Sequence, residues 1–165
     1  MSSWKNRIVG TGEESPEQLL ANPENYRAHP RAQREALSAV LDEIGFVAPV
    51  IVNRTTGHLV DGHLRVELAM GREESSVPVS YVELSLAEER LILATFDPLG
   101  DLGFADKDRL KELLDGIGTG EAAIQQLLAQ VADEAGILGA VAPFESSPPK
   151  MVKCPSCGDE FIPKR

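Results

Sequence analysis

The sequence predicts an α+β fold, in which short strands and helices form one domain and further helices follow it. Three observations support this. Apolar side chains between residues 31 and 44 recur every three or four positions, as on one face of a helix. Two short runs rich in β-branched residues, 49–52 and 77–82, are typical of strands. Beyond residue 98 only helical patterns remain before a short Cys-containing tail.

The elements are expected in a simple order. A short strand at 7–9 precedes a short helix that starts at Ser15-Pro16 and stops at Asn22-Pro23, because the residue before a proline disfavours helix. The next helix ends at Gly45, a residue suited to the position after a helix. The other expected elements are strands at 49–52 and 59–60, a helix at 62–70, a strand at 77–82, and helices at 86–95, 107–114 and 121–135.

Composition limits the possible functions. The formal charge of -10 argues against a protein that coats DNA, since phosphate contacts need Lys and Arg. The acidity lies mainly between residues 81 and 138, which leaves an Arg- and His-rich front half compatible with a local anion site. No apolar run approaches the roughly 20 residues that span a bilayer, and no secretory signal is evident. We therefore expect a cytoplasmic protein with no membrane partner.

The segment Asp61-Gly62-His63-Leu64-Arg65 carries the clearest functional signal. A strand ends at Asp61-Gly62 and a helix begins at once, so the free N–H groups of the first helical turn can bind an anion such as phosphate. His63 and Arg65 lie in that turn. Asp61 also suits a plain role as a helix cap, and Asp61 with His63 suits general acid–base chemistry beside a phosphate.

A second polar segment, Asn22-Pro23-Glu24-Asn25-Tyr26-Arg27, precedes the helix over 31–44. It contains several donors for an anion or a base, although Asn and Pro are also ordinary turn residues. His58, Asp61 and His63 offer a different possibility. Histidine and carboxylate suit a divalent metal, and these three could converge where the strand meets the helix, whereas His58 also fits a simple turn.

From about Ile8 to Thr95 the ordered set of motifs resembles the ParB/sulfiredoxin superfamily, specifically the ParB-like nuclease domain. Residues 22–27 look like the first ParB box, residues 46–52 resemble the strand that follows it, and residues 61–65 occupy the place of the phosphate-contacting Gly-Glu-Arg-Arg box. That box has no Cys here, so sulfinic-acid reduction is not expected. The third box falls near residues 88–100, where the match is poor. The pattern is most similar to ParB-like domains of phages and mobile elements that accompany DNA methyltransferases.

The resemblance implies a small mixed sheet with helices over residues 1–98, a helical extension at 99–138, a linker at 139–150 and a tail at 151–165. It implies a DNA-processing or DNA-modification role, with a nucleoside triphosphate and Mg²⁺ or a nucleic-acid phosphate bound at the 61–65 box. Nuclease, nucleotide-hydrolysing or phosphotransfer activity is an open question. The phosphate-binding candidates are Asn25, Arg27, Gly62, His63 and Arg65, and the catalytic candidates are Asp61, His63 and Glu67. Alternatives are a nucleotide-dependent kinase of a free amino acid such as serine, and a non-catalytic adaptor to a DNA methyltransferase.

The tail carries Cys154-Pro155-Ser156-Cys157-Gly158, which is similar to one knuckle of a zinc ribbon. A structural zinc site needs four ligands and no second pair follows. Cys154 and Cys157 therefore predict either a zinc ion shared through a homodimer or another partner, or a pair that is inert or redox-active. A structural disulfide is less expected in a cytoplasmic chain.

Overall fold

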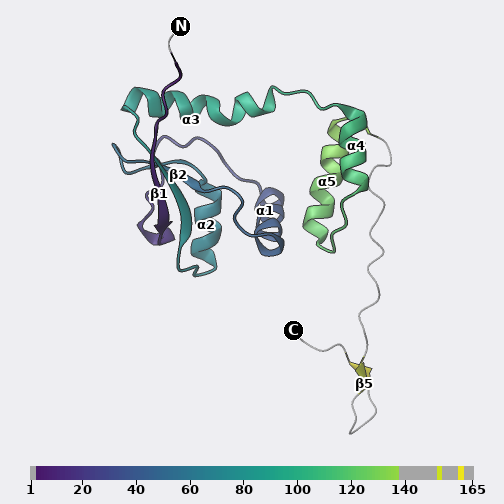
Figure 1. Cartoon of the computed structure of the whole chain (residues 1–165). Coiled ribbons are helices and arrows are strands. Elements are labelled where there is room, and N and C mark those ends of the chain that lie inside the picture. Colours follow the sequence, from purple (N-terminus) through teal and green to yellow (C-terminus); the bar gives the residue numbers. More distant parts are fainter. Residues whose placement is uncertain (1–2, 138–151, 154–159, 162–165) are drawn as a thin grey trace. The chain divides into compact units, whose positions relative to one another are not determined.

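The structure is a computed structural model that describes residues 3–137, 152–153 and 160–161. The predicted zinc ligands Cys154 and Cys157 lie outside these residues. The chain divides into two compact units, residues 1–106 and 107–165 (Figure 1). No helix in the described part is both long and apolar enough to cross a membrane.

The first unit is built on a four-stranded mixed sheet, which confirms the predicted α+β class. Its strands are β1 (Ile8–Glu14), β2 (Val50–Asn53), β3 (Leu59–Asp61) and β4 (Val77–Val82). They lie in the order β1-β4-β2-β3. The β2–β4 pair is parallel, and the other two pairs are antiparallel. The central strands β2 and β4 are thus each hydrogen-bonded to a strand at both edges.

Helices cover both faces of this sheet. Along β2, Val50 and Val52 belong to the core that includes Val66 of helix α2 (His63–Gly71). Ile51 lies between them and packs in a second cluster with Ile92 of helix α3 (Leu86–Asp101). Side chains alternate between the two faces of a strand, so α2 and α3 lie on opposite faces (Figure 1). Helix α3 also contacts β3, so the end of β3 and the start of α2 lie close to α3.

Helix α1 (Arg31–Glu43) confirms the prediction from periodicity, and Gly45 after it has a left-handed φ of 92°. Two expectations were wrong. The short strand at 7–9 is a seven-residue strand, because β1 pairs with β4 from Ile8 to Glu14 while its glycines conceal the strand pattern. The turn after Ser15 is only a 3₁₀ helix, η1 (Pro16–Gln18).

The helix expected at 86–95 continues through Pro98 to Asp101. Proline inside a helix removes one backbone hydrogen bond and usually kinks or ends it. Here the helix begins with a capping box, in which Ser85 and Glu88 satisfy each other's backbone N–H groups. The contacts of Glu89, Arg90 and Asp97 with the loop at 22–27 hold the helix in place up to the residue before Pro98.

The second unit, taken by itself, contains α4 (Lys107–Asp115), α5 (Ala122–Glu134) and the short strands β5 (Val152–Lys153) and β6 (Glu160–Phe161). Leu114 and Ala132 form the centre of a small core between the two helices. Both helices lie close to their predicted positions.

One buried carboxylate holds the first unit together. The Glu89 side chain of α3 is only 1% exposed, and it accepts hydrogen bonds from Asn22 Nδ2 at 2.8 Å, Asn53 Nδ2 at 2.5 Å and Thr56 Oγ1 at 2.5 Å. Burial favours the neutral acid, but the three hydrogen bonds outweigh it and hold the pKa of Glu89 below its usual range. Glu89 is therefore a charged residue in the interior, joined to three separate segments.

We predict that Glu89→Ala destabilises the fold by about 3 kcal/mol or more, because three buried donors lose their acceptor together. Urea unfolding followed by circular dichroism measures this change. Glu83→Ala, which removes an exposed carboxylate from the same region, is the control and is expected to change stability by less than about 0.5 kcal/mol. Similar effects of the two substitutions would show that the Glu89 network is not structurally important.

Candidate functional site

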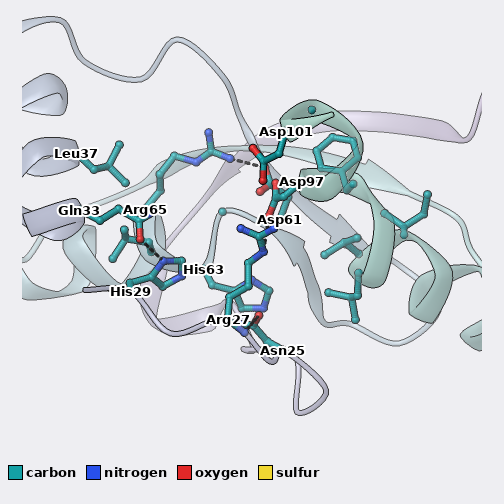
Figure 2. Close-up of a pocket in the computed structure, with 17 residues that line it drawn as sticks. Asn25, Arg27, His29, Gln33, Leu37, Asp61, His63, Arg65, Asp97 and Asp101 are labelled. Carbon is teal, nitrogen blue, oxygen red and sulfur yellow. Dashed lines mark hydrogen bonds and ion pairs between the residues drawn. The ribbon is translucent and has the colours of Figure 1, made fainter. Parts of the chain in front are cut away.

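A cavity of about 520 Å³ lies where the start of α2, the loop at 22–27 and helix α3 meet (Figure 2). The five predicted phosphate-binding residues, Asn25, Arg27, Gly62, His63 and Arg65, all line it, and so does Asp61. Its apolar lining residues are Leu37, Val60, Leu64, Ile92, Leu93 and Phe96. The structure thus brings two segments about 35 positions apart in the sequence to one cavity.

Gly62 makes the sharp turn from β3 into α2. Its φ is 92°, a left-handed conformation that side chains rarely adopt. A Cβ at this position would lie 2.6 Å from Cγ1 of Val50 and 2.8 Å from its Cβ, so the backbone packs directly on the central strand. Glycine here sets the direction in which the first turn of α2 points and places Arg65 beside Asp61.

Arg65 and Asp61 form an ion pair across this turn. Arg65 Nη2 donates to Asp61 Oδ2 at 2.5 Å, and the two side chains are 19% and 28% exposed. The sequence predicted Arg65 as a phosphate ligand and Asp61 as a catalytic carboxylate. In the structure each of these two residues is the other's partner.

Arg27 approaches the cavity from the loop and meets Asp97 of α3. Arg27 Nε lies 2.8 Å from Asp97 Oδ2, and the side chains are 34% and 44% exposed. The short distance is not accompanied by hydrogen-bond geometry: Arg27 Nε is buried and has no hydrogen-bond acceptor among the described residues. Figure 2 shows both guanidinium groups directed toward the same group of aspartates, which includes Asp101. Three carboxylates therefore face two guanidinium groups.

His63 is tied to the loop rather than left free. Its Nε2 accepts a hydrogen bond from the backbone N–H of Asn22 at 3.3 Å, which requires an unprotonated nitrogen. Burial lowers the pKa of His63, Asp61 opposes that shift and His29 adds to it. The side chain is thus held in the neutral form, with Nε2 already used.

Two other predicted residues lie away from the cavity lining. Glu67 pairs with Arg34 of α1 at 2.7 Å, a contact that lowers the pKa of Glu67 and links α2 to α1. His58 is in the turn before β3. The possible metal cluster of His58, Asp61 and His63 is wrong, because no group of three metal-ligating side chains occurs among the described residues. His63 faces the cavity, whereas His58 does not line it.

Sequence reasoning missed the contribution of α3. Glu89 accepts a hydrogen bond from Asn22, and Asp97 pairs with Arg27. Arg90 donates to both carboxylate oxygens of Glu24, at 2.8 and 2.5 Å. These three residues of α3 fix the loop at 22–27 over the cavity. The four-residue spacing of Glu89, Leu93, Asp97 and Asp101 on one side of a helix was visible in the sequence, and it could have indicated this role.

No protein-family model matches this chain, and no curated protein matches it. Among solved structures, it is similar to the crystal structure of the C-terminally truncated chromosome-partitioning protein ParB from Caulobacter crescentus complexed with CTP-gamma-S. The TM-score is 0.50 at 21% identity, over 74% of this chain and 79% of that one. The chain has a ParB-like fold. At this identity the likeness extends to the fold alone.

Two structures of the pNOB8-like ParB N-domain are also similar, with TM-scores of 0.49 and 0.48 at 18% identity. They cover 96% and 98% of this chain. This chain spans 59% and 56% of their length.

Gly62→Ala is expected to destabilise the protein by about 2 kcal/mol or more, since a Cβ would meet both an unfavourable φ and the Val50 side chain. Gly71→Ala is the matched control at the other end of α2, where φ is ordinary and no atom lies within 4 Å of the added Cβ. We expect Gly71→Ala to be neutral or to stabilise by up to about 1 kcal/mol. Thermal unfolding of both variants measures the difference. Equal melting temperatures for Gly62→Ala and Gly71→Ala would show that the conformation of Gly62 does not require glycine.

Stability is predicted to decrease on acidification through His63. Its pKa is lowered by folding, so the unfolded chain takes up the proton first, and the stabilisation is complete above the unfolded value of about 6.5. It is lost as the pH falls through the lower folded value. Urea unfolding at several pH values between 7.5 and 5.5 should show a steeper loss for the native sequence than for His63→Gln, which does not titrate. Equal slopes would refute the assignment.

Proposed function

We propose that the cavity binds a phosphate-bearing ligand, either a nucleotide or a nucleic-acid phosphate, and that the chain acts in DNA processing or modification. One observation carries the proposal: Arg27, Arg65 and the first turn of α2 all face one cavity. Guanidinium groups and free helical N–H groups are both strong phosphate donors. The similarity to a chromosome-partitioning ParB that binds CTP-gamma-S supports the nucleotide and the DNA-related role.

The remaining lining suits the rest of a nucleotide. A volume of about 520 Å³ is in the range of small-molecule sites, and Leu37 of α1 and Ile92 and Phe96 of α3 provide apolar lining for a base or a sugar. No group of three metal-ligating side chains occurs among the described residues, so Mg²⁺ would arrive with the triphosphate and find one unpaired carboxylate in the lining, that of Asp101. In this proposal Arg65 and α2 contact phosphate on one side, and Arg27 does so on the other.

Binding is proposed here without a hydrolytic step. The two cavity residues that the sequence offered as a general base are already engaged: Asp61 is paired with Arg65, and His63 Nε2 accepts a hydrogen bond from Asn22. Nuclease and serine-type kinase activities stay predictions, to be tested by following nucleic-acid cleavage and phosphoserine formation with purified protein.

A non-catalytic adaptor to a DNA methyltransferase is the second candidate function. It is favoured by the ion pairs, because both guanidinium groups of the cavity already have carboxylate partners. In an adaptor these pairs would be purely structural. Neither nucleotide nor DNA would then raise the melting temperature.

The test is a thermal-shift panel with CTP, ATP, GTP, UTP and a short DNA duplex, each with Mg²⁺. A ligand present at 100 times its Kd stabilises the native state by about 2.7 kcal/mol, so a binder is expected to raise Tm by several degrees. Arg65→Gln and Arg27→Gln should remove most of the shift. Arg31→Gln should retain it, because Arg31 is exposed, pairs with Glu35 and does not line the cavity.

An absence of shift with every nucleotide and with DNA would contradict the proposal. A shift that is equal in the native chain and in both cavity variants would place the ligand elsewhere. The adaptor function would then be preferred.

A further inference from the structure

The cavity has two guanidinium groups that a phosphate could bind, those of Arg27 and Arg65, and Asp97 forms an ion pair with the first. We propose that Asp97 acts as an internal competitor for the anion: its carboxylate holds the Arg27 guanidinium while the cavity is empty, and a bound phosphate replaces it. The proposal rests on the proposed function, since it concerns the affinity of that same cavity.

The geometry of the pair indicates that it is exchangeable. Arg27 Nε lies 2.8 Å from Asp97 Oδ2, yet this N–H has no hydrogen-bond acceptor among the described residues although its nitrogen is buried. The carboxylate thus compensates the charge of Arg27 but leaves a buried donor unsatisfied. The position of the Asp97 carboxylate is constrained by its helix. A phosphate entering the cavity is free to move until one of its oxygens is aligned with the Arg27 Nε–H.

The second pair of the cavity differs in each respect. Arg65 donates a hydrogen bond to Asp61 at 2.5 Å. Asp61 ends β3 and Arg65 lies four residues later in the first turn of α2, and both are more buried than Arg27 and Asp97. Asp97 is 44% exposed, so its carboxylate can be hydrated after it leaves Arg27. Exchange is therefore assigned to Arg27 and Asp97, and Arg65 keeps Asp61.

Asp101 provides a matched control. It lies one helical turn beyond Asp97 on α3 and lines the same cavity, and it takes part in no ion pair among the residues that the structure describes. Asp97→Asn and Asp101→Asn therefore remove the same charge from the same cavity. Only Asp97→Asn frees a guanidinium. The difference between them separates direct competition from the general repulsion of an anion.

The experiment measures the Kd of inorganic tripolyphosphate and of CTP by NMR titration in EDTA, so that no divalent cation engages the carboxylates. A partly exposed ion pair accounts for roughly a two- to fivefold change in affinity. We expect Asp97→Asn to bind about threefold more tightly than Asp101→Asn, and Asp101→Asn to differ less than threefold from the native chain. In the Arg27→Gln background the two Asn substitutions should have equal effects.

The competitor role would be overturned if Asp97→Asn bound the probes no more tightly than Asp101→Asn. It would also be overturned if Asp97→Asn kept its tighter binding in the Arg27→Gln background. In either case, binding by the native chain that Arg27→Gln weakens would leave the proposed function intact. If no variant binds either probe in EDTA, the competitor role fails, and the thermal-shift panel with Mg²⁺ decides the proposed function separately. Circular dichroism and urea unfolding verify that Asp97→Asn is folded. Asp97→Ser is a second variant for which the same gain is expected.

Discussion

The buried carboxylate of Glu89 is the interaction on which the first unit and its cavity depend. A charge in the interior is tolerated only when hydrogen bonds replace its water, and Asn22, Asn53 and Thr56 provide three of them. These donors come from the loop at 22–27, the end of β2 and the turn that follows β2. Glu89 thereby fixes α3 against the sheet and fixes the loop at 22–27 against α3. Without that arrangement Arg27 would have no defined position relative to the start of α2.

A second constraint acts from the opposite wall of the cavity. Gly62 allows the backbone to pack against Val50, so that α2 begins directly at the end of β3. His63 then reaches back to the N–H of Asn22, and the two walls are joined by this bond. The loop that bounds the cavity is thus tied to both α3 and α2, which favours side chains held in place before a ligand arrives.

Much of the fold could be predicted because its signals are local. The periodicity of α1, the apolar run of β4 and the strand-Gly-helix order around Gly62 each need only a short window of sequence.

What was missed depends on partners far away in the sequence. The length of β1 is decided by pairing with β4. Glu89 could not be recognised as buried, since glutamate is rarely buried without partners and its partners lie 33 to 67 positions away. Glu67 was expected at the site for its charge, but its place on α2 directs it to Arg34.

The charges of the cavity determine what kind of ligand it can hold. Asp61, Asp97 and Asp101 face Arg27 and Arg65, and His63 is kept neutral, so the lining carries more negative than positive charge. An isolated anion entering such a cavity gains a guanidinium only where a carboxylate gives one up, and the net gain is small. Affinity must then come from contacts that involve no such exchange. Ile92 and Phe96 offer such contacts to a base, and Asp101 offers one to a cation bound to the phosphates. The same argument disfavours inorganic phosphate alone and favours a ligand with an apolar ring, several phosphate groups and its own divalent cation.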